Sequence, residues 1–142
     1  MPFQNCRLIV TSKCNASCKF CHKEGRILDK EGDIFAVFDR LLELGMTDLQ
    51  VTGGEPTLHP DFGEFSRRVG LSNLRSSCIT TNGLLLAQHR EALLKYGNVR
   101  VSLHSAIPEE RSEIFGVRVT AEDLLYAAFG KCSIPAKKSA QL

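Results

Sequence analysis

Apolar positions along the chain follow two periods, one typical of strands and one typical of helices. Four short runs rich in β-branched and apolar residues predict strands, at residues 6–12, 48–52, 77–81 and 98–105. Longer segments with apolar residues three and four positions apart predict helices, at residues 33–45, 61–69, 84–97 and 120–130. Strands and helices therefore alternate along the chain.

This alternation predicts an α/β fold in which βα units build a parallel sheet. We expect about four βα units, and the start of a fifth strand within residues 134–142. Parallel sheets bind ligands at the carboxyl ends of their strands. A distinctive local sequence lies at the carboxyl end of each predicted strand: a cysteine-rich loop, then "GGEP", "TTNG" and "SLHS". The pattern indicates one shared site built from these four segments.

Length and charge limit the possible functions. The chain of 142 residues is long enough for one domain over residues 1–142, and its formal net charge is +2. A balance this even gives no reason to expect binding to nucleic acid or to a membrane surface. The N-terminus lacks a signal-peptide pattern, so we expect a cytoplasmic protein. In that compartment, six cysteines favour metal ligation over disulfide bridges.

Three of the cysteines, Cys14, Cys18 and Cys21, lie within eight residues, and no fourth cysteine lies beside them. We expect Cys6 and Cys78 to pack in the core, because free cysteine in a buried strand behaves as a small hydrophobic residue. An iron–sulfur cubane that is held by three thiolates keeps one iron open for a ligand. The alternative is a zinc loop whose fourth ligand is His22.

The segment Cys14–Cys21 reads C-x₃-C-x-Φ-C, with the aromatic residue at Phe20. This pattern resembles the signature of the radical S-adenosylmethionine (SAM) enzymes. The resemblance implies a truncated form of that superfamily's partial (βα)6 barrel. It also implies a 4Fe–4S cluster on the three cysteines and SAM on the open iron. Transfer of one electron to SAM would generate a 5′-deoxyadenosyl radical, which removes a hydrogen atom from the substrate.

Further segments are similar to SAM-binding motifs of that superfamily. "TGGEP" resembles its GGE motif, which implies that Gly53, Gly54 and Glu55 bind the methionine amino group. Glycines let a backbone approach a ligand closely, and a carboxylate suits an ammonium group. The resemblance also implies that Phe20 lies near the adenine and that Ser102 contacts the cofactor. Each of these residues alone would more often be a turn or capping residue.

Within the superfamily, the chain most resembles the N-terminal part of the archaeal-type GTP 3′,8-cyclases of molybdenum cofactor biosynthesis. That likeness implies substrate contacts at Arg7, Thr80 and Lys137, with GTP as the expected substrate. Arginine and lysine suit a triphosphate, as a planar fork and as a point charge. It also implies an electron donor such as flavodoxin or ferredoxin. The alternative for Arg7 and Lys137 is a solvated surface charge.

The chain departs from the cyclase pattern in several places. Gln50 stands where the cyclases usually carry a basic residue, and His104 stands where many carry aspartate. The second cysteine triplet, which holds the cyclases' second cluster, is absent from these residues. A full barrel needs about 250 residues. We therefore expect an N-terminal fragment, a truncated gene product or a degenerate relative, which does not complete GTP cyclisation alone.

Two other readings stay open. "GGEP" and "TTNG" also occur in radical enzymes that modify peptides or natural products, so these motifs do not select the cyclase. A non-catalytic iron–sulfur or zinc module would use the same three cysteines.

Overall fold

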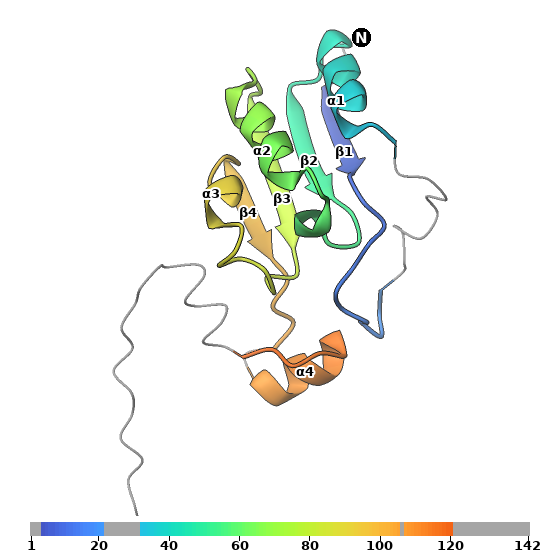
Figure 1. Ribbon diagram of the computed structural model, residues 1–142, viewed down its shortest axis with the longest axis vertical. Coiled ribbons are helices and arrows are strands. Elements are labelled where there is room, and N and C mark those ends of the chain that lie inside the picture. Colours follow the sequence, from blue (N-terminus) through green and yellow to red (C-terminus); the bar gives the residue numbers. More distant parts are fainter. Residues whose placement is uncertain (1–3, 22–31, 106, 121–142) are drawn as a thin grey trace, which may run out of the picture.

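The computed structural model describes residues 4–21, 32–105 and 107–120. Within them the chain forms a four-stranded parallel sheet whose order follows the sequence, β1-β2-β3-β4 (Figure 1). The strands are β1 (Asn5–Ile9), β2 (Asp48–Thr52), β3 (Ser76–Thr81) and β4 (Asn98–Val101). The helices are α1 (Ile34–Glu43), η2 (Pro56–Leu58), α2 (Phe62–Leu71), α3 (Arg90–Leu93) and α4 (Pro108–Phe115). The α/β fold with a parallel sheet is confirmed, and it is consistent with part of a radical SAM (βα) barrel.

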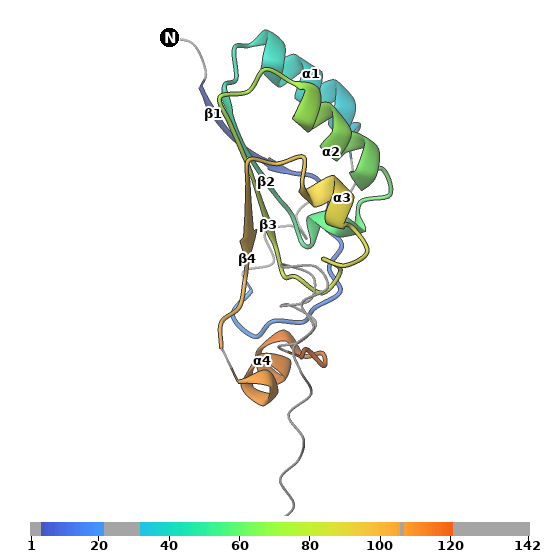
Figure 2. The ribbon, with the colours of Figure 1, turned by 90° about the vertical axis from the view of Figure 1, so that its left-hand side faces the viewer.

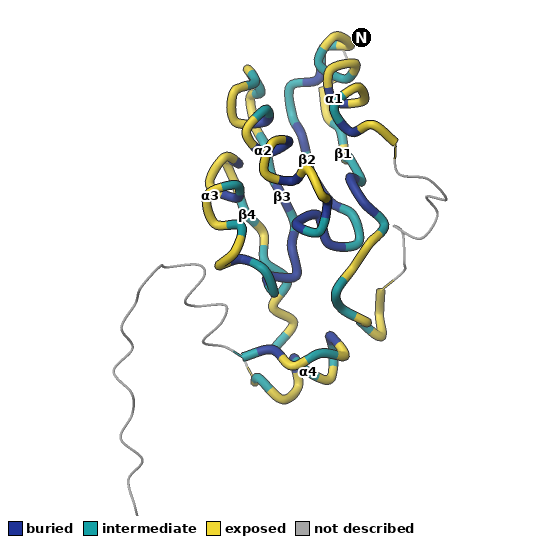
Figure 3. Tube along the Cα trace, in the orientation of Figure 1, coloured by how far each residue is buried: buried dark blue, intermediate teal, exposed yellow. Residues whose placement is uncertain are grey.

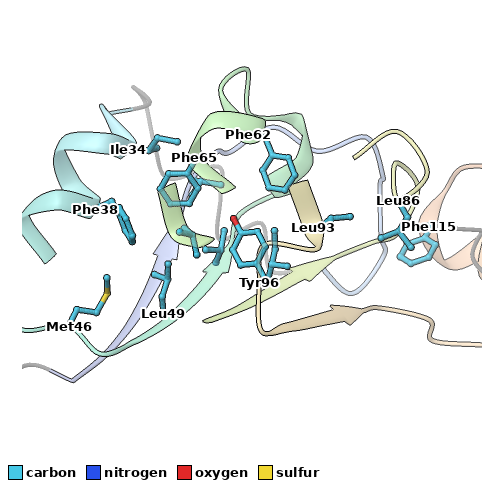
Figure 4. Close-up of a cluster of buried hydrophobic side chains, with 14 of the residues drawn as sticks. Ile34, Phe38, Met46, Leu49, Phe62, Phe65, Leu86, Leu93, Tyr96 and Phe115 are labelled. Carbon is cyan, nitrogen blue, oxygen red and sulfur yellow. The ribbon is translucent and has the colours of Figure 1, made fainter. Parts of the chain in front are cut away.

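Helices α1, α2 and α3 pack against one face of this sheet, and α4 lies beyond the carboxyl ends of the strands (Figure 2). Alternate strand residues point to this covered face, where Leu49, Val51 and Ile79 are buried. The rings of Phe38 and Phe65 pack edge to face at 5.4 Å between α1 and α2 (Figure 4). The core therefore lies between the sheet and its three helices, and the buried strand and helix residues are coloured dark blue in Figure 3.

No described helix covers the opposite face of the sheet (Figure 2). This face carries the polar side chains of Arg7 and Gln50, which are partners in the strand register. Gln50 is in turn the register partner of Cys78. Together with Arg100 these residues line an open groove of about 530 Å³. The prediction that Cys78 packs in the core is wrong: it is half-buried and lines this groove. Cys6 is also half-buried, and it packs against the core.

The start of the sheet is closed by Asp48. Its carboxylate accepts hydrogen bonds from Arg75 (2.6 Å), Ser76 (2.6 Å) and Thr47 (2.6 Å). These bonds, with Arg75 first, lower the pKa of Asp48 to about 2. The strand starts are thus fixed by a carboxylate that holds β2 against the segment leading into β3.

The predicted helix over residues 84–97 is wrong in length, since only Arg90–Leu93 is α-helical. Residues 84–89 instead form turns, which begin at Gly83 with a φ of 85° and a hydrogen bond from Leu86 N–H to the Gly83 carbonyl (3.4 Å). This path buries both Leu86 and Leu93 in the core. Tertiary packing thus prevails over the local helical pattern.

Helix α4 is not among the helices that the sequence pattern predicts, although its ends carry ordinary signals. Pro108 occupies the first turn, where a missing N–H costs nothing, and two glutamates follow it. Gly116 ends the helix in the left-handed conformation, with a φ of 65°. The helix has little amphipathic character, which is why a search for apolar periodicity does not find it.

The predicted helix over 120–130 and the expected fifth strand within 134–142 lie outside the described residues, apart from Thr120. Among the helices that are described, none has the length and apolarity that crossing a membrane requires.

Candidate functional site

The segments that follow the four strands meet at the carboxyl end of the sheet. They precede α4 in the sequence and lie next to it in space (Figure 1). They are residues 10–21 after β1, 53–58 after β2, 82–84 after β3 and 102–105 after β4. We call residues 14–21 the cysteine loop. The shared site that the strand pattern predicts thus has its four segments at one end of the sheet.

Gly53 and Gly54 let the segment after β2 run against the segment that leads into the cysteine loop. The N–H of Gly54 donates to the Thr11 carbonyl (2.9 Å), and the N–H of Glu55 donates to the Lys13 carbonyl (2.7 Å). A Cβ on Gly54 would lie 2.3 Å from the Lys13 carbonyl oxygen, and one on Gly53 would lie 2.6 Å from that of Thr11. In this structure, then, the close approach that requires glycine is to the chain's own backbone.

Glu55 is fully buried, with 0% of its surface exposed. One carboxylate oxygen, Oε1, accepts from the hydroxyls of Thr57 and Thr81 (2.7 Å each) and from the N–H of Thr57 (3.2 Å). The other, Oε2, accepts from the N–H of Asn82 (2.7 Å). A carboxylate has about four lone-pair positions, so these four bonds satisfy it. Glu55 therefore joins the end of β2 to the end of β3.

Asn82 extends this network to the cysteine loop. Its side-chain N–H₂ donates to the side-chain oxygen of Asn15 (2.8 Å), and its own oxygen accepts from the N–H of Leu84 (3.0 Å). Through Asn82, the buried carboxylate of Glu55 is linked by two hydrogen bonds to a residue that lies next to Cys14.

The three cysteines of the loop differ in exposure: Cys14 and Cys21 are exposed, and Cys18 is half-buried. Burial raises the pKa of Cys18, and the charges of Cys14 and Cys21 raise it further. All three cysteines belong to the same eight-residue loop. The N–H of Cys21 also donates to the Cys18 carbonyl (3.2 Å), which closes a turn between two of them.

The chemistry of this donor set fits a metal centre with one open position, because the loop offers three thiols and none of the other described cysteines lies in it. Among the described residues, however, no three His, Cys, Asp or Glu side chains stand in a metal-binding arrangement. Forming a centre therefore requires the exposed loop to close its thiols around the metal. His22, the fourth ligand in the zinc alternative, lies outside the described residues.

Phe20 is 50% exposed, and its ring packs on His104 with 4.5 Å between the ring centroids. His104 in turn contacts Phe115 of α4 at 5.7 Å. The backbone of Ser17 donates to the Phe115 carbonyl (2.7 Å). The cysteine loop is thus held from the side of β4 and α4 as well as from the side of Asn82.

The remaining predicted site residues are spread over the sheet. Ser102 follows β4 directly, and its N–H donates to the Thr81 carbonyl (3.0 Å). Thr80 lies on β3 beside Arg100 in the register, so it shares the polar face of the sheet with Arg7. The structure brings Gly53, Gly54 and Glu55 close to the approach to the cysteine loop. Lys137 lies outside the described residues.

Several residues of the site were not singled out from the sequence. Thr57, Thr81 and Asn82 bind the buried carboxylate, and Arg111 and Phe115 belong to the missed helix α4. Thr81 and Asn82 lie in "TTNG", a motif that the sequence does mark, but only the register of β2 and β3 shows which of its groups point to Glu55.

Comparison with known proteins agrees with this geometry. Residues 8–128 match the sequence model of the Radical SAM superfamily. The chain is 36% identical over 123 residues to a protein named probable GTP 3′,8-cyclase from Metallosphaera sedula. It is 39% identical over 123 residues to one of the same name from Thermococcus kodakarensis. Each alignment covers 82% of this chain and about two fifths of the relative, at 39% and 40%.

A third relative with that name, from Methanococcus maripaludis, is 35% identical over 115 residues, which are 76% of this chain and 39% of the relative. The chain thus spans about two fifths of the length of the curated relatives that it matches. The match to the superfamily covers most of the chain, including all three cysteines of the loop and the "GGEP" turn. The chain belongs to the radical SAM superfamily.

Proposed function

We propose that this chain binds a 4Fe–4S cluster through Cys14, Cys18 and Cys21 and uses it, with SAM, to generate a 5′-deoxyadenosyl radical. The observation that carries the proposal is a loop with three cysteines, C-x₃-C-x₂-C, at the carboxyl end of a parallel sheet in a superfamily member. When bound, the cluster supplies the electron that cleaves SAM.

The chain's own residues would orient SAM and shield it. The segment Gly53–Glu55 offers backbone groups at the edge of the cysteine loop, and the exposed ring of Phe20 offers an apolar surface for adenine. Ser102 offers a hydroxyl from the neighbouring segment. The carboxylate of Glu55 already accepts four hydrogen bonds, so a direct contact with the methionine ammonium would have to exchange one of them. Its negative charge would attract the ammonium even without such a contact.

For the substrate, we propose GTP or a related nucleotide, on the polar face of the sheet. Arg7 and Arg100 both line the groove on that face, and Thr80 lies beside Arg100. Two guanidinium groups suit a polyphosphate. The names of the relatives, which are probable GTP 3′,8-cyclases, support this substrate. Lys137 and an external electron donor such as flavodoxin or ferredoxin complete the proposal.

Anaerobic reconstitution of the chain with iron and sulfide tests the cluster. We expect about four iron atoms per chain and a broad absorption near 400 nm. Cys18→Ala should lose both, because two thiolates do not hold the cubane. Cys78→Ala is the matched control, since Cys78 lies on the sheet face rather than in the loop, and it should retain both. Stoichiometric zinc without that absorption would contradict the proposal.

Retention of radiolabelled GTP by the reconstituted chain tests the substrate. We expect Arg100→Met to weaken retention without changing the iron content, because Arg100 lies on β4 and outside the cysteine loop. If the reconstituted wild-type chain retains no GTP, the nucleotide part of the proposal is wrong, while the cluster assignment stands.

A further inference from the structure

The turn after β4 holds His104 in an unusual backbone conformation. His104 is the one described non-glycine residue with a positive φ, at 56°. The N–H of Ser105 donates to the Leu103 carbonyl (2.7 Å), which closes a three-residue turn with His104 at its centre. A turn of this kind with a positive central φ is rare and strained. Such strain persists only where the surrounding structure enforces it.

Arg111 of α4 provides that enforcement. Its Nε donates to the carbonyls of Leu103 (3.1 Å) and Ser105 (3.0 Å), the residues on either side of His104, and its Nη2 also donates to Ser105. Only 3% of Arg111 is exposed, and its Nη1 is buried without a hydrogen-bond partner among the described residues. Burying a guanidinium is costly. Here the buried guanidinium hydrogen-bonds to the backbone on both sides of His104 and so fixes its conformation.

The ring of His104 is connected to the cysteine loop in two ways, one direct and one through Phe115. It packs on Phe20, the residue before Cys21, at 4.5 Å. It also contacts Phe115 at 5.7 Å, and the Phe115 carbonyl accepts from the N–H of Ser17, the residue before Cys18. A Cβ on Gly116 would come within 3.2 Å of the Ser17 side chain, so the end of α4 lies directly against the loop.

We propose that His104 is a positioning residue whose ring, held by the strained turn and by Arg111, fixes the cysteine loop in place. The part that concerns metal retention depends on the function proposed above; the part that concerns loop order does not. Because the contact is between rings, its effect should follow the ring at position 104 rather than the charge or the hydrogen-bonding capacity of the side chain.

Two substitutions separate the ring from the backbone. His104→Asn removes the ring and keeps a residue type that tolerates positive φ, whereas His104→Phe keeps a ring at a less tolerant backbone. The first readout is amide hydrogen exchange of residues 14–21 in the 142-residue apo-protein. We expect His104→Asn to speed this exchange about threefold to tenfold, as the loss of one aromatic contact implies. Exchange in β2 should be unchanged, and His104→Phe should restore protection of the loop.

Phe20→Leu removes the other half of the contact and gives a double-mutant cycle. Its effect on the exchange of residues 14–21 should not add to that of His104→Asn, because both variants lose the same contact. If the two effects add fully, or if His104→Asn leaves the loop's exchange at the wild-type rate, the positioning role is wrong. Exchange that rises equally throughout the chain would also contradict it, because the ring would then support the whole fold.

The second readout is iron loss to a chelator from the reconstituted protein, where His104→Asn should be about threefold to tenfold faster than wild type and His104→Phe close to wild type. If the variants show the expected changes in exchange of residues 14–21 but neither they nor the wild type take up iron, the cluster assignment is wrong and the positioning role stands. Altered loop exchange with unaltered iron loss would show that His104 orders the apo loop only, and would overturn its role toward the metal.

Discussion

Two regions at the same end of the sheet differ sharply in how they are held. Around Glu55, the residues that donate to the carboxylate are buried, and the carboxylate accepts four hydrogen bonds. In the cysteine loop, Cys14 and Cys21 are exposed, and the contacts described above attach the loop at Asn15, Ser17 and Phe20. The rigid region supports the site, and the exposed region carries the groups that would bind metal.

The two regions should contribute differently to the free energy of unfolding. Removing any partner of a buried, fully hydrogen-bonded carboxylate destabilises the protein, because the remaining polar groups stay buried and unpaired. Replacing an exposed thiol changes the free energy of unfolding little, because water already surrounds the side chain. Substitutions in the two regions should therefore separate stability from metal binding, and the following predictions test that separation in order of decreasing effect on unfolding.

Glu55→Ala should have the largest effect. It leaves the hydroxyls of Thr57 and Thr81 and the N–H of Asn82 without their acceptor, at a cost of about 3 kcal/mol or more in the free energy of unfolding. Urea denaturation of the apo-protein followed by circular dichroism measures this cost. Glu55→Gln keeps the volume and one acceptor oxygen, so its loss should be smaller. If Glu55→Ala is as stable as wild type, the buried network does not support the site.

Gly54→Ala should come next, at about 1–3 kcal/mol, because the new methyl group would lie 2.3 Å from the Lys13 carbonyl and the backbone would have to shift. Gly63→Ala is the matched control: nothing lies within 4 Å of its Cβ position in α2, so it should be neutral or slightly stabilising. Thermal unfolding of both variants gives the comparison. Equal melting temperatures would mean that the tight approach of the two segments can relax freely.

Asn15→Ala should have the smallest effect, about 1 kcal/mol or less, because it removes a single hydrogen bond at the boundary between the two regions. Its clearer consequence is local: proteolysis or hydrogen exchange in residues 14–21 should increase while β2 and β3 remain protected. A loss as large as that of Glu55→Ala would show that the cysteine loop is part of the buried network, and the contrast between the regions would disappear.

Much of this architecture can be predicted from the sequence. The bounds of β2 are the predicted ones, and the ends of α1, α2 and β3 differ from the predicted ones by at most two residues. These elements have strong local signals, namely short apolar runs and an amphipathic period. All strands of the sheet are parallel, so the four segments that follow them must lie at the same end of the sheet.

The contacts within the site could not be predicted in the same way. Whether Glu55 faces a ligand or the protein interior depends on the register of β2 with β3, which a single sequence does not define. The turn at His104 depends on Arg111, seven residues later, in a helix with little periodicity. The prediction that Cys78 packs in the core treats its whole strand as buried, but strand alternation places Cys78 on the polar face.

The closed hydrogen bonding of Glu55 also bears on how such a protein would be matured. Many small metal-binding domains stay unfolded until the ion arrives, so that filling the site and forming the chain's structure are one event. Here all four hydrogen bonds to the carboxylate come from groups of the same chain, so protein groups alone join the end of β2 to the end of β3. This connection does not need an inorganic group, and loss of such a group from the cysteine loop would leave the two strands joined.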